Sequence, residues 1–335
     1  MHVPAPRATF RAPIATLACC IAIGCGWASA PAAAQGGYPT KPIQLVIPFP
    51  PGGSTDVIGR LVGQKMSERL GQTVVVDNRP GAGTIVGASF VAKAAPDGYT
   101  LLATSGTTFT VNPAVYPHLP YDPAKNFEPI GQIGSTSLVL LANRDVPVNN
   151  LKEFVAAAKA APGKYSYASF GTGTTAHFAG EALQTLTGTK LLHVPYKGSA
   201  PAMTDLIGGQ VPFSVDTVTA AIPQLKSGKI KAIAVTTAKR SALLPDVPTV
   251  AESGYPGMDA GTWLAIVAPK GLPPEVKAKL EKTLAEVVAD PAMRQKLAEA
   301  GFDAAFANGA QVTATIAKEA PQMRAIARNA NIKLD

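Results

Sequence analysis

Short strand-like runs alternate with helical patterns along this chain, and that alternation constrains the fold more than any other feature. Apolar runs of four or five residues are followed by glycine-containing turns and then by apolar residues spaced three and four apart. A β-α-β-α-β order predicts a parallel sheet, because parallel neighbours need a crossover and the helix supplies it. The first such unit has predicted strands at 43–47, 73–76 and 99–103 and helices at 57–70 and 85–91.

A second unit of the same kind follows later in the chain. Its first helix is expected to end at Gly188 and its next turn to contain Gly198, and the same ten-residue spacing separates Gly71 from Gly81 in the first unit. Two similar α/β halves explain this spacing better than chance. The second unit has predicted strands at 165–168, 191–194, 211–215 and 230–235, a helix at 174–186 and a helix opening after 195–198.

Extended segments predict that the chain passes between the two halves twice. Residues 127–134 and 138–142 lead out of the first half, and residues 262–268 lead back. Helices that begin near Pro274 and at Asp290 are expected to pack on the first half. The expected fold class is therefore α/β, a clamshell of two lobes with a hinge of crossing strands. Lobe 1 is expected to comprise residues 35–138 and 259–335, and lobe 2 residues 139–258.

The first 34 residues have the pattern of a secretory signal peptide. Arg7 and Arg11 precede a short apolar run, and small residues up to Ala34 follow it. We predict cleavage after Ala34, because cleavage after Ala30 would leave a proline as the first residue. A membrane anchor and a lipid anchor on Cys25 are alternatives, although the apolar run is short for a bilayer.

The composition fits an exported protein held together by apolar cores. Removal of 34 of the 335 residues leaves 301, and all three cysteines are lost with the removed segment. An exported chain without disulfides must be stabilised by large cores, and a hydrophobic share of 47% excludes intrinsic disorder. The net charge of +8 is spread along the chain without a basic run, which argues against a nucleic-acid partner.

Three loops rich in glycine, serine and threonine follow predicted strands, at 50–56, 104–108 and 169–174. The carboxyl ends of parallel strands share one edge of a sheet, where open α/β folds bind ligands. Glycine lets a ligand approach the backbone, while hydroxyl groups and helix N-termini supply hydrogen-bond donors. This combination suits a carboxylate, sulfate or phosphate. The alternative is that the loops are tight turns with helix caps, which need the same residues.

Motifs for catalysis, cofactors and metals are weak or absent in the sequence. Residues 171–176 fit the dinucleotide pattern G-x-G-x-x-A, but the acidic residue expected after the next strand is missing. Neither a phosphate-binding P-loop nor a G-x-S-x-G motif occurs, and His118, His177 and His193 lack the spacing of metal ligands. We therefore expect no catalytic residue, no cofactor and no metal site.

Four titratable residues near the loops are open to more than one interpretation. His177 lies in the first turn of its predicted helix, where it could contact a ligand or brace the loop. Asp216 ends a predicted strand and could accept a hydrogen bond from a ligand's amine, hydroxyl or protonated group, or cap the next helix. Asp56 offers the same choice. His193 lies within an apolar strand and is expected to be an interior histidine.

Seven segments of the chain resemble one known family and occur in that family's order. They are residues 38–43, 48–56, 78–83, 96–99, 171–177, 195–198 and 245–252. On these residues the chain resembles the periplasmic solute receptors of tripartite tricarboxylate transporters, also called Bug receptors. The resemblance covers nearly the whole chain after the predicted signal peptide.

The resemblance implies a periplasmic, type II-like binding protein that closes on a small carboxylate, such as an amino acid, a dicarboxylate or an aromatic acid. It implies membrane transporter subunits as partners, a monomer, and no enzymatic activity. One ligand carboxylate would be held by backbone N–H groups and hydroxyls, and Asp216 would mark the far end of the pocket. The ligand-binding positions carried over are Gly53, Ser54, Thr55, Asp56, Thr104, Ser105, Gly171, Thr172, Gly173, Thr174, His177 and Asp216.

Two other functions stay open at this point. A secreted hydrolase or isomerase acting on small organic acids would need an organised base and nucleophile, and the sequence contains no motif for either. A receptor that feeds signalling rather than transport would share the same ligand site. The segment before Asp216, Phe213–Val215, is less apolar than is usual in the family, so the sequence leaves the ligand itself undefined.

Overall fold

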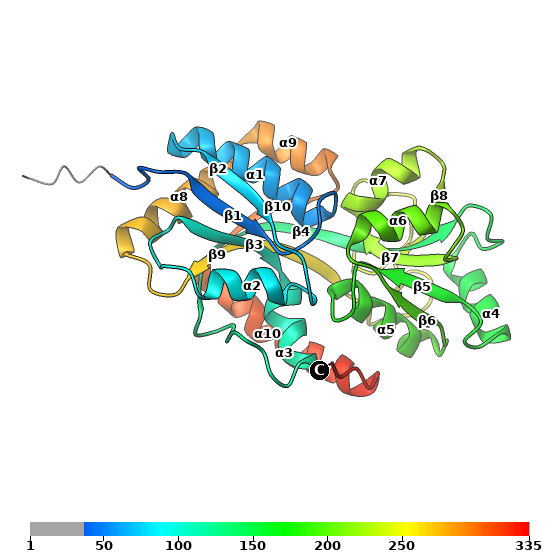
Figure 1. The fold of residues 1–335 in the computed structure, drawn as a ribbon. Helices are drawn as coiled ribbons and strands as arrows, with labels where there is room; N and C mark the ends of the chain where they lie inside the picture. The colour runs from blue at the N-terminus through cyan, green and yellow to red at the C-terminus, as the bar shows by residue number, and fades with distance from the viewer. Residues whose placement is uncertain (1–36, 335) are drawn as a thin grey trace, which may run out of the picture. The chain divides into compact units, whose positions relative to one another are not determined.

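The computed structural model of the protein describes residues 37–334, and the predicted signal peptide at 1–34 lies outside the described residues. None of the helices in this described part is both long and apolar enough to cross a membrane. The chain forms an α/β structure of two lobes, each built on one half of a continuous sheet (Figure 1). The fold class predicted from the alternating pattern is therefore confirmed.

The first sheet has the strand order β2-β1-β3-β9-β4, with β10 paired to β4. Strand β1 pairs with β2 and β3 in parallel, as the β-α-β-α-β order predicts, whereas β9 is antiparallel to both β3 and β4. The strands are β1 (Ile43–Ile47), β2 (Val74–Asn78), β3 (Thr100–Ser105), β4 (Phe127–Asn143), β9 (Gly261–Pro269) and β10 (Asp303–Asn308).

The second sheet has the order β4-β7-β5-β6, with β8 also paired to β4. Strand β5 lies between β6 and β7 and is parallel to both, so the order β6-β5-β7 repeats the order β2-β1-β3 of the first sheet. This repetition agrees with the two similar halves that the glycine spacing predicts. The strands are β5 (Ser166–Ser169), β6 (Leu192–Pro195), β7 (Phe213–Thr217) and β8 (Ile230–Val235).

Strand β4 belongs to both sheets and connects the lobes. The sequence predicts two extended segments here, and the structure joins them into one strand of 17 residues. Its first part pairs with β9, and its last part, from Leu138 on, pairs with β7 and β8. Register shifts at Gly131 and Gly134 mark bulges that bend the strand. Strand β9 is the predicted return crossing.

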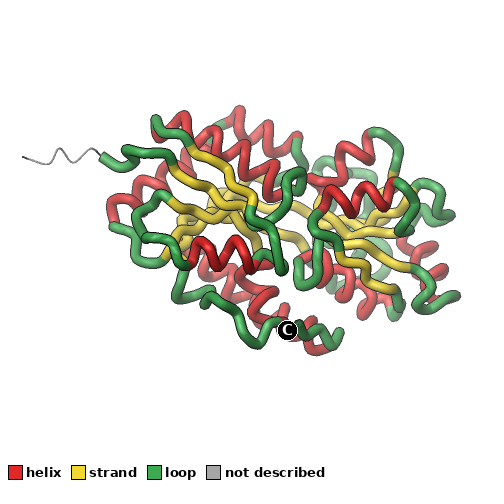
Figure 2. The backbone as a smooth tube through the Cα atoms, viewed as in Figure 1, coloured by secondary structure: helices red, strands yellow, loops and turns green. Residues whose placement is uncertain are grey.

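The helices flank the sheets (Figure 2). Helices α1, α2, α5, α6, α8 and α9 begin close to where the sequence predicts, whereas α3, α4 and α10 were not predicted. Gly71 and Gly188 end α1 and α5 in the left-handed conformation, with φ of 67° and 63°, so the same cap closes the first helix of each half. The helices are α1 (Ser54–Leu70), α2 (Ile85–Ala92), α3 (Asn112–Val115), α4 (Leu151–Ala160), α5 (Thr175–Thr187), α6 (Ser199–Ile207), α7 (Val218–Lys226), α8 (Pro274–Ala289), α9 (Pro291–Glu299) and α10 (Gly309–Asn329), with a π-helical turn η1 (Thr107–Val111).

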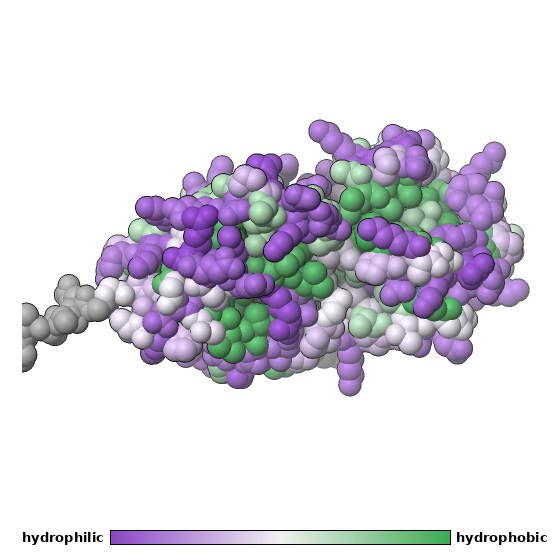
Figure 3. Space-filling model, turned by 90° about the horizontal axis from the view of Figure 1, so that it is seen from above, coloured by the Kyte–Doolittle hydropathy of each residue, from purple (hydrophilic) through white to green (hydrophobic). Residues whose placement is uncertain are grey.

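Separate apolar clusters fill the faces of the two sheets. One cluster packs β1 and β9 against α1, α8 and α9, which places the first two C-terminal helices on the first lobe as predicted. Two further clusters cover the faces of the second sheet. Helix α10 packs on β4, η1 and α3, and Ala327 on this helix also lies in a cluster with Phe178 on α5 of the second half. Hydrophilic residues cover much of the surface seen in Figure 3, between smaller hydrophobic areas.

Candidate functional site

A cavity lies where the carboxyl ends of the parallel strands of both sheets meet. It takes its walls from both halves and from the crossing strands, and the space inside it that a water molecule can occupy is about 30 Å³. The lining residues are Phe49, Pro50, Gly53, Ser54, Thr55, Ser105, Thr136, Phe170, Thr175, Gly198, Ser199, Thr217, Thr262, Trp263, Leu264 and Phe302.

Four helices begin at the wall of this cavity. Gly53 and Ser54 form the start of α1, Thr175 begins α5, Ser199 begins α6, and Thr217 caps α7. The first N–H groups of a helix have no partner within the helix, and the dipole makes this end partly positive. The cavity is therefore suited to an anionic group.

Two buried hydroxyl groups on the cavity wall have no hydrogen-bond partner among residues 37–334. They are Thr175 Oγ1 at the start of α5 and Thr262 Oγ1 on β9. Buried polar atoms are nearly always paired in folded proteins, so an unpaired hydroxyl that lines a cavity indicates a group that binds there. Both hydroxyls can donate to a ligand oxygen.

Aromatic rings form the apolar part of the wall. Phe49 and Phe170, from the two halves, meet edge to face with ring centroids 6.1 Å apart. Trp263 presents its ring to the cavity but donates its indole N–H to both carboxylate oxygens of Glu319 on α10, at 3.0 and 2.9 Å. The indole N–H is therefore not available to a ligand.

The loop before α1 is held by Asp56 from behind. Its carboxylate accepts from the Gly52 N–H at 3.0 Å, from Arg60 Nε at 2.9 Å and from Asn78 Nδ2 at 2.9 Å. Burial raises the pKa of Asp56, but these hydrogen bonds outweigh burial and hold the pKa below its ordinary value. Gly52 has a φ of +88°, which glycine adopts without strain. Asp56 thus shapes the loop that carries Gly53 to the cavity.

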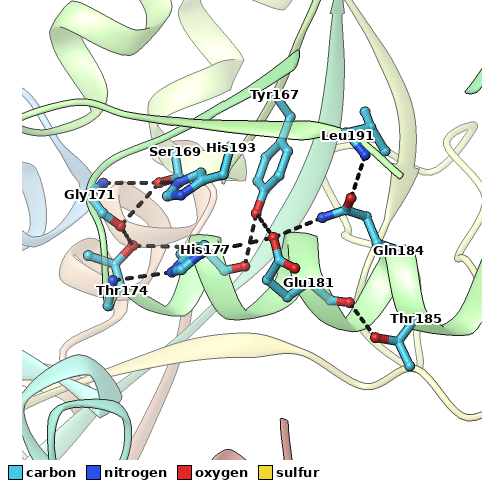
Figure 4. Close-up of polar contacts among 11 residues, drawn as sticks. Tyr167, Ser169, Gly171, Thr174, His177, Glu181, Gln184, Thr185, Leu191 and His193 are labelled. Atoms are coloured by element: carbon cyan, nitrogen blue, oxygen red, sulfur yellow. Dashed lines mark hydrogen bonds and ion pairs between the residues drawn. The ribbon is translucent and has the colours of Figure 1, made fainter. Parts of the chain in front are cut away.

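The loop between β5 and α5 is fixed by hydroxyl and imidazole groups (Figure 4). Ser169 Oγ accepts from the Gly171 N–H at 3.2 Å and lies 2.7 Å from His193 Nε2. Thr174 Oγ1 donates to the Gly171 carbonyl at 2.7 Å, and the Gly173 N–H donates to His177 Nδ1 at 3.3 Å. These contacts fix the conformation of the loop.

His177 and His193 stack behind this loop, with ring centroids 3.9 Å apart and planes 10° from parallel (Figure 4). Burial lowers the pKa of His177 to about 4, and burial together with the His177 ring lowers the pKa of His193 to about 3. Both rings are thus neutral at neutral pH. His177 Nδ1 accepts from Gly173, so the ring proton lies on Nε2, which is 3.9 Å from a carboxylate oxygen of Glu181.

Asp216 is completely buried directly behind the cavity wall. Its Oδ1 accepts from the Ser199 hydroxyl at 2.8 Å and from the Thr217 N–H at 2.7 Å, while Oδ2 has no partner. Burial raises the pKa of Asp216 to about 7, against the lowering effect of these hydrogen bonds. Within residues 37–334, Asp216 forms no ion pair with a cation. Thr217, and not Asp216, is the side-chain cap of α7.

The two halves touch around the cavity. A Cβ atom on Gly53 would lie 3.6 Å from Ser199 Oγ, and one on Gly83 would lie 3.1 Å from the Thr172 carbonyl oxygen. The Thr175 N–H donates to Thr107 Oγ1 across the same gap, at 3.3 Å. The structure is therefore a closed form of the clamshell.

The predicted ligand-binding residues fall into three groups by position. Gly53, Ser54, Thr55 and Ser105 line the cavity. Gly171, Thr172 and Thr174 line a groove that adjoins it and shares Phe49, Pro50 and Phe170 with it. Asp56, Thr104, Gly173, His177 and Asp216 lie behind these surfaces, and Thr104 is buried against Thr108.

Several cavity residues were not anticipated from the sequence. Ser199 follows the predicted turn at 195–198, so its place at a helix start could have been found. Thr136 and Thr262 are single threonines within crossing strands, where nothing in the sequence distinguishes them. As for metals, no group of three or more histidine, cysteine, aspartate or glutamate side chains comes together within the described part of the chain.

Comparison with known proteins identifies close relatives of this chain. Residues 58–332 match the family model described as the tripartite tricarboxylate transporter family receptor. The chain is 37% identical over 298 residues to Protein BugT of Bordetella pertussis, which covers 89% of this chain and 91% of that protein.

Solved structures agree with this similarity. One described as R. palustris Rpa4515 with adipate is 35% identical, has a TM-score of 0.87 and covers 89% of this chain and 99% of its own. Another, MatC (Rpa3494) from Rhodopseudomonas palustris with bound malate, is 30% identical, with a TM-score of 0.81 and coverage of 86% and 99%.

Proposed function

The chain belongs to the tripartite tricarboxylate transporter receptor family, and from this premise we propose that its cavity holds a carboxylate group of a small organic acid between α1 and α5. Membership makes the protein a periplasmic solute-binding receptor for small carboxylates rather than an enzyme. The observation that carries the proposal is the pair of unpaired buried hydroxyls, Thr175 Oγ1 and Thr262 Oγ1, on a wall where α1 and α5 begin.

The carboxylate would receive hydrogen bonds from these two hydroxyls and from the free N–H groups at the start of α1. Hydrogen bonds to a charged acceptor are the stronger kind, and the helix dipoles add a favourable field. In the part of the chain that the structure describes, no Lys or Arg lines the cavity. The ligand charge would therefore be balanced by hydroxyl and backbone dipoles, as at other helix N-termini that bind anions.

Ligand binding would stabilise the closed form because the ligand contacts both halves. Gly53 and Ser54 come from the first half and Thr175 from the second, so a ligand between them binds the closed form more tightly than an open one. The crossing strands β4 and β9 would form the hinge. We assign lobe 1 to residues 35–138 and 259–335, lobe 2 to residues 139–258, and the loop residues named above to ligand binding or its support.

The closed receptor would act as a monomer that delivers its ligand to membrane transporter subunits. An N-terminal signal peptide, cleaved after Ala34, would direct its export. Relatives described with adipate and malate make these acids suitable first probes for the receptor.

Calorimetric titration with adipate and malate, together with variants of the two hydroxyls, tests the proposal. Thr175→Val and Thr262→Val are expected to weaken binding of the better acid about tenfold each, because each removes one hydrogen bond to a charged group. Thr185→Val is the matched control, since Thr185 lies on the same helix but is exposed outside the cavity. Unchanged affinity in both cavity variants would place the carboxylate elsewhere.

A further inference from the structure

The hydroxyl group of Ser199 has its only hydrogen already committed. Ser199 Oγ lies 2.8 Å from Asp216 Oδ1, and an ionised carboxylate can only accept, so the serine donates. Protonation of Asp216 does not reverse this bond. Oδ1 also accepts from the Thr217 N–H at 2.7 Å, so an added proton goes to the unpaired Oδ2.

Ser199 therefore offers only lone pairs to the cavity. It lines the wall, and its oxygen faces Gly53 at the start of α1, 3.6 Å from where a Cβ on that glycine would lie. A ligand group that reaches Ser199 Oγ must donate a hydrogen bond to it. A carboxylate oxygen placed there would meet a second acceptor.

When Asp216 is ionised, its charge behind Ser199 adds to this preference. Asp56, the other buried aspartate at a helix start, is paired with Arg60, whereas Asp216 has no cationic partner within residues 37–334. The Asp216 carboxylate lies beside the first turns of α6 and α7 and offsets the positive ends of their dipoles. The cavity thus has an anion-binding side, at α1 and α5, and an acceptor side, at α6 and α7.

On the basis of the proposed carboxylate site, we propose that Ser199 binds a hydrogen-bond donor on the ligand and that Asp216 orients Ser199 for this contact. The receptor then selects acids with a hydroxyl or ammonium group near the carboxylate. The narrow gap between Gly53 and Ser199 places the two sides close together. A donor on the carbon next to the carboxylate is the arrangement that reaches both. Ser199 is then a specificity-determining residue, and Asp216 positions it.

Matched acids of two chain lengths test this selection by calorimetry. The C4 set is succinate, malate and aspartate, and the C6 set is adipate, 2-hydroxyadipate and 2-aminoadipate, with both enantiomers of each chiral acid. We expect that in one set at least one donor-bearing acid binds about tenfold or more tightly than the unsubstituted acid, because the unsubstituted acid leaves Ser199 Oγ without a partner.

Three variants assign the selection to these residues. Ser199→Ala is expected to bring the ratio of affinities between donor-bearing and unsubstituted acids close to one. Ser199→Thr keeps the hydroxyl and should keep the ratio. Asp216→Asn keeps an acceptor for Ser199 but removes the charge, so it should keep the preference for the hydroxy acid and weaken the preference for the amino acid. Circular dichroism verifies that each variant is folded.

The possible results separate this inference from the proposed function. If unsubstituted acids bind as tightly as donor-bearing acids, or if Ser199→Ala retains the ratio, the selection by Ser199 is wrong while the carboxylate site stands. If none of the acids binds to the wild-type protein, the carboxylate site itself fails, and the inference is overturned with it.

Discussion

Replacing Asp216 by asparagine should change how the stability of this protein depends on pH. The side chain has almost the same shape, and Ser199 can still donate to the remaining carbonyl oxygen. Asparagine cannot ionise, however, so the variant avoids the free-energy cost of burying a charge that has no cationic partner within residues 37–334.

The size of the effect follows from the pKa of Asp216, which burial raises from 3.8 to about 7. At pH 5 the folded protein binds a proton on Asp216 that the unfolded chain does not bind, so the raised pKa contributes stability at this pH. At pH 8 both states are ionised and the contribution is lost. Linkage between these two pH values gives a loss of about 2–3 kcal/mol in the free energy of unfolding of the wild-type protein.

Urea unfolding of the ligand-free wild type and Asp216→Asn, at pH 5 and pH 8, measures this difference. Subtracting the wild-type values from those of the variant cancels the contributions of the other titrating groups. These groups include His177 and His193, whose lowered pKa values change the stability in the opposite direction. Relative to the wild type, the variant should gain about 2–3 kcal/mol of unfolding free energy between pH 5 and pH 8. A difference of less than about 0.5 kcal/mol, or one of opposite sign, would refute the argument that Asp216 is a buried, uncompensated acid.

Three further predictions concern the supports of the cavity. Neutral His177 and His193 contribute stability that is present above about pH 6.5 and is lost as the pH falls toward 4. The unfolding free energy of His193→Gln should therefore fall less steeply than that of the wild type as the pH is lowered below about 6.5. Trp263→Phe should lower the unfolding free energy by about 1–3 kcal/mol, because half-buried Glu319 loses the hydrogen bonds from the indole N–H; unchanged urea midpoints would contradict this. Gly173→Val should lower the unfolding free energy by about 1–3 kcal/mol, since Gly173 has a φ of +67°, which strains a residue with a side chain. The same change should weaken binding of malate or adipate, and retained affinity in calorimetry would show that binding does not need this loop conformation.

The sequence predicts those elements whose ends are defined by local chemistry. Helix α1 starts after the glycine pair at 52–53 and ends at Gly71, and α5 starts after Thr174 and ends at Gly188. Each of these ends lies within a few residues of its predicted position. These ends depend on caps and left-handed glycines, which need no tertiary contact. The alternation of strands and helices likewise depends on hydrophobic period, which is a local property.

The sequence did not predict features that depend on contacts between distant residues. The π-helical turn η1 and the edge strand β10 have no distinctive pattern, and β10 exists because β4 offers it a partner. Thr136 and Thr262 reach the cavity only because β4 and β9 pair with each other as they cross between the sheets. The orientation of Ser199 depends on Asp216, 17 residues away, and no spacing rule relates a serine at a helix start to an aspartate at a strand end.

The repeated topology explains why the cavity has two chemically different sides. Strands β1 and β5 occupy the same place in their sheets, so the loops that follow them carry α1 and α5 to the cavity from opposite halves. Strands β3 and β7 are also equivalent, and their last residues, Ser105 and Thr217, both line the cavity. The residue before each differs: the first half has Thr104, a neutral side chain bonded to Thr108, and the second has Asp216. The two equivalent strand ends therefore place different chemistry beside the cavity, a neutral threonine in the first half and an ionisable aspartate in the second.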